Sequence, residues 1–231
     1  MELIQLVKDK PADYYAFADQ DDVWRLDKLA IAQRQLTLSQ NKPALFMSTY
    51  NVVDQDLNLL FKRDMHFSWP FTLESTLVYR CPSGCTMVFN RALFNILVAS
   101  RPEYIRMHDF WTLLTAEAVG AQLLTSEEPL LEYRQHGDNA VGFNKGETGK
   151  KIKRLFKSMI FNKNERQRQG IAVLENYRQY CRPEQLASLT KLAQYRHHFK
   201  NRFHLAFDDQ FKTQNHQKNF LFKLSVLLGA F

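Results

Sequence analysis

The chain has 231 residues, of which 45% are hydrophobic, and a formal net charge of +7 at pH 7. This size allows one domain with its own core plus an additional region. No run approaches the roughly 18 continuous apolar residues of a membrane-spanning helix. The first residues lack the regions of a secretory signal, and the number of cysteines is odd, which favours a reducing compartment. We therefore expect a cytoplasmic protein, in which Cys81 and Cys85 are packing residues.

The first part of the chain begins with a short apolar helix, predicted for residues 1–10. A buried strand is predicted at residues 14–18, where aromatic and small apolar residues follow one another. Asp27 is expected to cap the next helix, which should end near residue 40. The apolar spacing of that helix predicts that three residues face the core: Leu29, Ala32 and Leu36.

Strands and helices continue to alternate as far as residue 142, which indicates an α/β domain over residues 1–142. Asn90 is a capping residue type directly before an apolar helical pattern. The C-terminal region, residues 143–231, is basic and helical in its spacing, including residues 184–207. The predicted strands are residues 44–50, 57–63, 86–89, 121–125 and 129–133, and the further helices are residues 73–79, 91–100 and 110–120.

An acidic run follows the first predicted strand, with the sequence Ala18-Asp19-Gln20-Asp21-Asp22-Val23-Trp24. Ligands of open α/β sheets bind where strands end. Clustered carboxylates repel one another, so a fold keeps them together mainly around a cation. Carboxylate oxygens suit Mg²⁺ or Mn²⁺, which in turn hold phosphate oxygens. The alternative is a solvated turn rich in Asp, but the flanking strand and Trp24 favour the metal–phosphate site.

Three further motifs carry chemistry, and each has a plain structural alternative. Asp109 stands at a predicted helix start, where it is either an N-cap or a general base that accepts a proton. The sequence Arg134-Gln135-His136-Gly137-Asp138-Asn139 supplies either a metal ligand and a phosphate contact or a polar turn. Gly84 lies in a tight loop, where it either allows close approach of a ligand or simply forms the turn.

The positive charge is concentrated between residues 145 and 170, where nine Lys and Arg residues face only Glu147 and Glu165. This segment alone carries the excess of +7. Residues 150–157 alternate basic and apolar positions as an amphipathic helix on an anionic bilayer does. A solvated helical bundle is the open alternative, and no nucleic acid is expected because no binding motif accompanies the charge.

Four motifs in this order resemble family 2 glycosyltransferases, most closely the bacterial rhamnosyltransferase-like branch. The resemblance covers roughly residues 3–142, and motifs that are weak singly are specific in this order. The matching segments are Phe17-Ala18-Asp19-Gln20-Asp21-Asp22-Val23-Trp24 with Asp27-Lys28-Leu29, Ser83-Gly84-Cys85-Thr86-Met87-Val88-Phe89-Asn90-Arg91, His108-Asp109-Phe110-Trp111, and Glu128-Pro129-Leu130 with Tyr133-Arg134-Gln135-His136-Gly137-Asp138-Asn139.

The resemblance implies a partial GT-A fold, a Rossmann-like mixed sheet with helices on both faces, followed by the helical C-terminal region. It implies an inverting transferase that uses a nucleotide-sugar donor and a divalent metal, Mg²⁺ or Mn²⁺. Asp109 matches the catalytic base. The matched metal ligands are Asp21, Asp19 and His136, with Asp21 preferred and Asp19 nearer the nucleotide; the matched donor-binding residues are Asp19, Asp22, Trp24, Gly84, Arg134 and Gln135.

The resemblance also implies a role in surface polysaccharide synthesis. The acceptor would be a saccharide or a lipid-linked molecule, the sugar rhamnose, and the location the cytoplasm or the inner face of the plasma membrane. The usual first strand, with its Pro-x-Tyr/Phe-Asn and Asp-Asp-Gly-Ser motifs, does not occur here, so roughly the first 80 residues of a typical member are expected to be missing. An inactive fragment is therefore one expectation, and a non-catalytic basic module that binds an anionic membrane or nucleic acid is the alternative function.

Overall fold

A six-stranded mixed sheet organises the first half of the chain within the residues that the structure describes. The computed structural model describes residues 2–78, 82–135 and 164–231. The strands run in the order β1-β5-β3-β6-β2, and β4 pairs with the last residues of β3, Asn51 to Val53, outside this order. The molecule is therefore of the α/β class, as the alternating pattern predicts. The strands are β1 Tyr14–Ala16, β2 Val23–Trp24, β3 Ala44–Val53, β4 Leu59–Lys62, β5 Val88–Asn90 and β6 Gln122–Arg134.

Strands β3 and β6 form the central pair of the sheet, and they are parallel. Each of the other pairs is antiparallel. The two strand pieces predicted at residues 121–125 and 129–133 belong to one strand, β6. Its register against β3 shifts near Ser48 and Thr49, where Pro129 stands opposite Thr49. Proline cannot donate to the ladder, so an irregularity at this point is the expected outcome.

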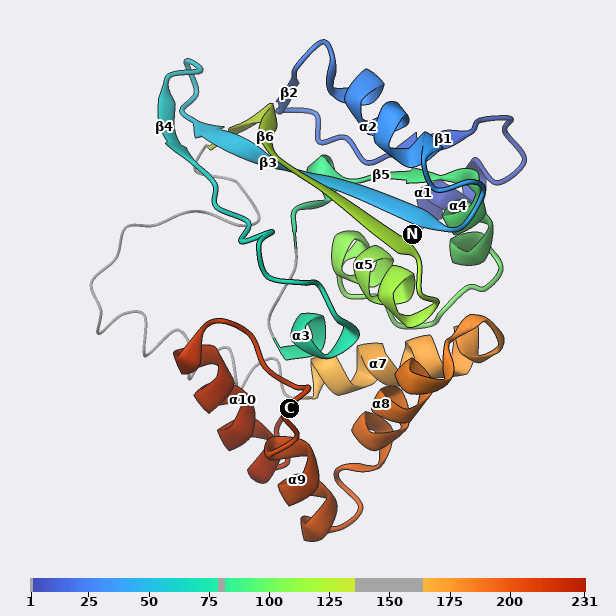
Figure 1. The fold of residues 1–231 in the computed structure, drawn as a ribbon, viewed down its shortest axis with the longest axis vertical. Helices are drawn as coiled ribbons and strands as arrows, with labels where there is room; N and C mark the ends of the chain where they lie inside the picture. Colours follow the sequence, from blue (N-terminus) through green and yellow to red (C-terminus); the bar gives the residue numbers. More distant parts are fainter. Residues whose placement is uncertain (1, 79–81, 136–163) are drawn as a thin grey trace.

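Helices cover both faces of the sheet (Figure 1). On one face, α2 (Lys28–Thr37) buries Ala32 and Leu36 against Phe46 of β3, as the spacing predicts. The prediction for Leu29 is wrong, because 51% of this residue is exposed. On the opposite face lie α4 (Arg91–Val98) and α5 (His108–Ala118). Their buried side chains pack against the strand residues that alternate with those facing α2. Short α1 (Glu2–Leu6) precedes β1.

Strand β1 is an edge strand and pairs only with β5 among the described residues. The sequence predicts a buried strand here, but all three residues of β1 are half-buried. The ring of Tyr15 packs against β5 and α4: it stacks on Phe94 of α4, with 3.7 Å between ring centroids. The apolar composition therefore reflects packing against α4 rather than enclosure within the sheet.

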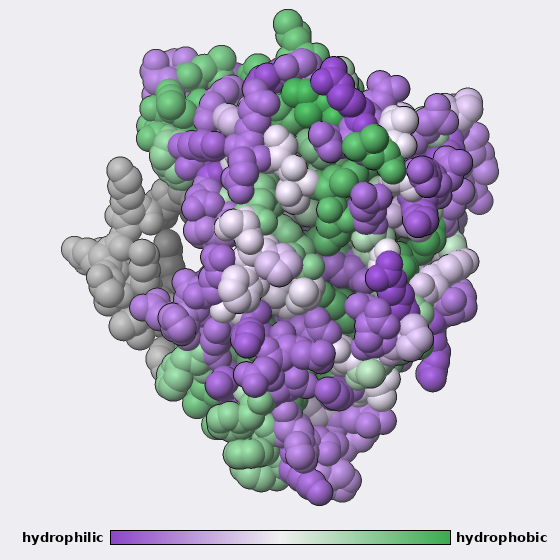
Figure 2. Space-filling view, viewed as in Figure 1, coloured by the Kyte–Doolittle hydropathy of each residue, from purple (hydrophilic) through white to green (hydrophobic). Residues whose placement is uncertain are grey.

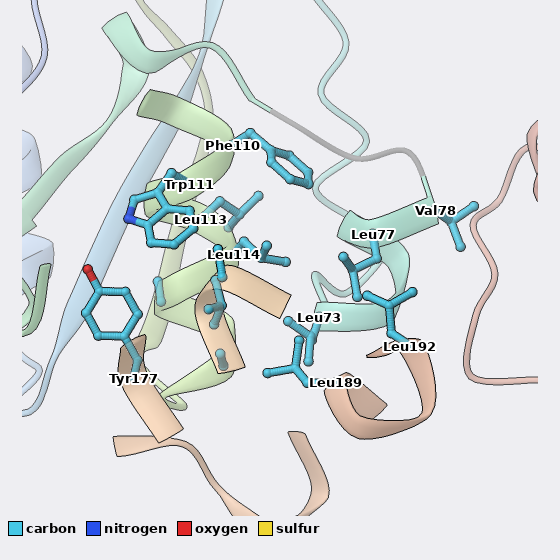
Figure 3. Close-up of a cluster of buried hydrophobic side chains, with 14 of the residues drawn as sticks. Leu73, Leu77, Val78, Phe110, Trp111, Leu113, Leu114, Tyr177, Leu189 and Leu192 are labelled. Atoms are coloured by element: carbon cyan, nitrogen blue, oxygen red, sulfur yellow. The ribbon is translucent and has the colours of Figure 1, made fainter. Parts of the chain in front are cut away.

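Four helices of the C-terminal region pack below the sheet layer, against α5 and α3 (Leu73–Val78). They are α7 (Glu165–Tyr177), α8 (Pro183–Gln194), α9 (Phe199–Ala206) and α10 (His216–Leu227). Figure 3 shows Tyr177 of α7 beside Trp111 of α5, with ring centroids 5.8 Å apart. The Tyr177 hydroxyl also donates to the carbonyl of Leu97 at 3.0 Å. One hydrophobic core thus continues from the sheet layer into these helices.

Several predicted features fall on residues 79–81 and 136–163, outside the described part of the chain. They are Cys81, His136, the boundary between residues 142 and 143, the amphipathic helix at residues 150–157 and most of the basic segment. Among the described residues, no helix has both the length and the apolarity needed to cross a membrane.

Helix starts differ in how far their caps could be predicted. Asn90 caps α4, since its side chain accepts from the backbone N–H of Leu93 at 3.1 Å. Asp27 occupies the N-cap position of α2 but makes no capping hydrogen bond; its carboxylate pairs with Arg25 instead. Asp109 is not an N-cap, because α5 begins one residue earlier and Met107 holds that position. The capping interpretation of Asp109 is therefore wrong, and its carboxylate is left for another role.

Candidate functional site

The acidic run after β1 meets the turn before β5. Carboxylate oxygens of Asp19 and Asp22 and the Sγ atom of Cys85 lie within 4.8 Å of one another. Cys85 belongs to a short 3-10 turn, Gly84–Thr86, which brings it under the acidic run. It is buried, in agreement with its predicted packing role. Two carboxylates and a thiol therefore share one small volume.

Asp22 is the half-buried member of this group. Its Oδ1 accepts from the backbone N–H of Arg134 at 3.3 Å. Its Oδ2 is buried and has no hydrogen bond of normal geometry to any described residue. Burial raises the pKa of Asp22 to about 6, against a weaker lowering by the adjacent Cys85 thiol. A buried carboxylate oxygen of this kind is oriented to accept a proton or a cation.

A buried ammonium group contacts the same turn. Lys28, in the first turn of α2, is 0% exposed. Its Nζ donates to the carbonyl of Cys85 at 2.5 Å and lies 3.4 Å from the centre of the Trp24 ring. Burial lowers the pKa of Lys28 to about 8, while the charges of Asp22 and Asp19 act in the opposite direction. The burial of Lys28 was not predicted, because a lysine at a helix start normally points to solvent.

The same turn contacts the start of α5 through Gly84. A Cβ atom on Gly84 would lie 2.3 Å from Nε2 of His108, so the imidazole packs directly on the glycine backbone. The ring of Phe17 meets His108 edge-on at 4.6 Å. Only a residue without a side chain fits between this imidazole and the turn. The sequence predicts that Gly84 allows another group to approach closely, and in the structure that group is the imidazole of His108.

Asp109 follows His108 and is only 6% exposed. Its Oδ1 accepts from the backbone N–H of Phe110 at 2.6 Å. Burial raises the pKa of Asp109, and the hydrogen bond from Phe110 and the charge of His108 reduce that rise. A carboxylate with a raised pKa holds a proton more strongly than an exposed one, which is the property a general base needs.

The end of β6 fixes the acidic run in place. The guanidinium of Arg134 donates from Nε to the carbonyl of Asp21 at 3.1 Å and from Nη1 to the carbonyl of Gln55 at 2.7 Å. The backbone N–H of Gln135 donates to Val53 at 2.8 Å and extends the β3–β6 pairing. Arg134 thus acts on the backbone of the run, and the adjacent Gln135 lies at the same edge of the sheet.

Consecutive residues of one turn therefore join the two halves of the site. Cys85 faces Asp19, Asp22 and Lys28, and Gly84 faces His108 and Asp109. Of the predicted residues, Asp19, Asp22, Trp24, Gly84, Asp109 and Arg134 gather here.

The sequence motif makes Asp21 the preferred metal ligand. Asp21 is not one of the three residues whose ligand atoms lie together, which are Asp19, Asp22 and Cys85. The carboxylates of Asp19 and Asp22 fit a hard divalent cation, and the buried Oδ2 of Asp22 supports that fit. Cys85 does not fit such a cation, because burial raises the pKa of its thiol and keeps it protonated.

The comparisons with known proteins add no assignment: no family model and no curated protein matches this sequence.

Proposed function

We propose that the protein is a family 2 glycosyltransferase that moves a sugar from a nucleotide-sugar donor to an acceptor with inversion. The observation that carries this proposal is the convergence of Asp19 and Asp22 with Gly84 and Asp109 around one turn. These residues are up to 90 positions apart in the chain. Three separate motifs of the resemblance thus contribute to one site, as a shared reaction would require.

The fold supports the same proposal. A mixed sheet with helices on both faces is compatible with a partial GT-A domain. The acidic run leads from β1 to β2, the strands at the two ends of the strand order, and its carboxylates lie close to Cys85 of the turn that carries Gly84. Ligands of α/β sheets bind outside the ends of strands, where loops of this kind meet.

Asp19 and Asp22 are the residues that would hold Mg²⁺ or Mn²⁺, with Asp21 and His136 assigned only by the sequence motif. The metal supplies Lewis-acid stabilisation of the diphosphate leaving group. Trp24, held by Lys28, forms one wall beside the carboxylates. Arg134 holds the acidic run through its backbone, and together with Gln135 it completes the donor side of the site.

Asp109 is the proposed general base. The acceptor hydroxyl gives its proton to Asp109 as its oxygen forms a bond to the anomeric carbon. The bond from that carbon to the phosphate oxygen breaks on the opposite face, and the nucleoside diphosphate leaves with the electron pair. A single displacement of this kind inverts the anomeric configuration. The raised pKa of Asp109 favours the proton transfer, because the carboxylate is a stronger base.

The broader role follows from the resemblance alone. The donor sugar is proposed to be rhamnose, and the acceptor a saccharide or a lipid-linked intermediate of cell-surface polysaccharide synthesis in a bacterium. Such donors are cytoplasmic molecules, so the proposed location is the cytoplasm.

Titration calorimetry of the chain with dTDP, UDP and GDP in the presence of Mn²⁺ tests the donor site. We expect binding of one nucleotide that disappears with a chelator. Asp22→Asn should weaken it at least about tenfold, since a metal ligand is lost. Asp109→Asn should leave it within a few-fold of wild type, because a base acts in the transition state.

Two controls complete this experiment. Asp13→Asn changes an exposed carboxylate next to β1 and should have no effect on binding. Release of the nucleoside diphosphate from the matching nucleotide-sugar should be lost in Asp109→Asn. Binding that persists with chelator, or nucleotide release by Asp109→Asn at the wild-type rate, would contradict the assignment.

A further inference from the structure

An outward face of α9 carries a row of exposed phenylalanines. Phe199 and Phe203 in the helix and Phe207 directly after it are spaced four residues apart, which places them on one side. They are 68%, 52% and 51% exposed, respectively. The rings of Phe203 and Phe207 lie 4.6 Å apart, so the row is continuous.

Helix α10 extends this surface. Nζ of Lys223 lies 5.1 Å from the centre of the Phe207 ring, which joins the two helices on their outer side. Phe220 and Leu228 of the same region are 65% and 64% exposed. Figure 2 shows hydrophobic residues over α9 and α10 at the lower end of the molecule, bordered by hydrophilic ones. We refer to Phe199, Phe203, Phe207, Phe220 and Leu228 as the aromatic patch.

The aromatic patch is not needed to hold the helices together. Leu205 and Ala206 of α9 and Phe222 and Val226 of α10 already fill the core on the inner side. A helix that only covers a core carries polar residues on its outer face. Five large apolar side chains on the outer side therefore indicate contact with something else.

The surrounding charge indicates what that partner is. Between residues 196 and 223, six Lys and Arg residues accompany only two acidic residues, Asp208 and Asp209. A second copy of this surface would bring like charges together, whereas an anionic partner would not. The basic residues are Arg196, Lys200, Arg202, Lys212, Lys218 and Lys223. Lys218 is half-buried, and burial lowers its pKa to about 7, so the other five supply the surface charge.

We propose that α9 and α10 lie on an anionic lipid bilayer, with the aromatic patch inserted at the level of the headgroups. Aromatic and leucine side chains with flanking Lys and Arg are the composition of interfacial helices. Nucleic acid is the competing occupant, because bases also stack on aromatic rings, and the experiment below distinguishes it from a bilayer. Helices α9 and α10 lie at the end of the molecule away from β1, β2 and α2, so this contact leaves the candidate site accessible (Figure 1).

Co-sedimentation with vesicles tests this surface in the intact chain. We expect binding to phosphatidylcholine mixed with phosphatidylglycerol, and much weaker binding to phosphatidylcholine alone. Replacing Phe199, Phe203 and Phe207 by Ser should lower the partition coefficient at least about tenfold. The double change Lys200→Glu and Lys223→Glu should lower binding to the anionic vesicles only.

The matched control changes Leu3 and Leu6 to Ser, since these α1 residues are 77% and 76% exposed but lie in another part of the chain. This variant should bind vesicles like wild type, and circular dichroism should show that each variant is folded. Equal binding of the triple Phe variant and wild type would overturn the proposal. So would binding of a single-stranded RNA homopolymer without lipid binding, or a dimer that the triple variant loses. Vesicle binding is measured without any nucleotide, so its result does not depend on whether the protein is a transferase.

Discussion

The imidazole of His108 packs on the backbone of Gly84, where a Cβ atom would lie 2.3 Å from Nε2. His108 also contacts the ring of Phe17 in an edge-to-face arrangement, with 4.6 Å between ring centroids. The turn before β5, the start of α5 and the residue that follows β1 are therefore fixed by one ring. This arrangement makes the position of Asp109, the next residue, depend on the size of residue 84.

The contact between Gly84 and His108 predicts a specific non-additivity. Gly84→Ala should lower the free energy of unfolding by about 1–3 kcal/mol, because the imidazole has to move from a packed position. Adding His108→Ala should recover most of that loss. Urea unfolding of wild type, both single variants and the double variant measures the coupling. Effects that add within about 0.5 kcal/mol would show that the two residues do not interact.

Replacement of Lys28 should also destabilise the fold, although lysine is usually a surface residue. Lys28→Met keeps the length of the side chain but leaves the carbonyl of Cys85 without its donor. An unsatisfied buried carbonyl costs about 1–3 kcal/mol. Lys42→Met, at an exposed position, serves as the control and should change stability by less than about 0.5 kcal/mol. Equal urea midpoints for the two variants would mean that the buried ammonium contributes nothing.

The raised pKa of Asp22 predicts how stability depends on pH. The folded protein binds the proton of Asp22 more tightly than the unfolded chain, since the pKa rises to about 6 on burial. The stability contribution of this group is therefore full at acidic pH and is lost as the pH rises through about 6. Asp22→Asn lacks the titration, so the stability of wild type relative to this variant should fall between pH 4 and pH 7. Thermal unfolding at several pH values measures the difference, and a constant difference would contradict the burial of Asp22.

The shared core predicts that the sheet layer and the C-terminal helices unfold together. Leu189 of α8 is fully buried in the cluster drawn in Figure 3. Leu189→Ala should lower the free energy of unfolding by about 2–5 kcal/mol. Near- and far-ultraviolet circular dichroism should still report one transition. Leu38→Ala at an exposed position is the control, and two separate transitions would show that the helices form an independent unit.

Local signals predicted much of the fold. The spacing of Ala32 and Leu36 identified the inner side of α2, and Asn90 identified the start of α4, because both depend on nearby residues. Leu29 shares the apolar character of its neighbours but is half exposed, which local spacing alone does not show. The half-buried state of β1 was not predictable, since it depends on which strands pair with it.

The motifs of the candidate site were predicted from the sequence. Only the fold shows that they lie close together. The acidic run contains three carboxylates, and sequence alone does not show which two turn towards Cys85. Asp22 does so because Arg134 holds its Oδ1 from β6, more than a hundred residues away. The burial of Lys28 was not predicted for the same reason, since its partner Cys85 lies 57 residues further along the chain.

The turn that carries Gly84 and Cys85 also constrains how this chain can evolve. Neighbouring residues serve opposite sides of it, one against His108 and the other against Lys28 and Asp22. An inserted or deleted residue would disturb both contacts, because the glycine would no longer meet the imidazole and the thiol would no longer meet Asp22. Descendants of this sequence are therefore expected to vary in length in the connections around the site while this turn keeps its length.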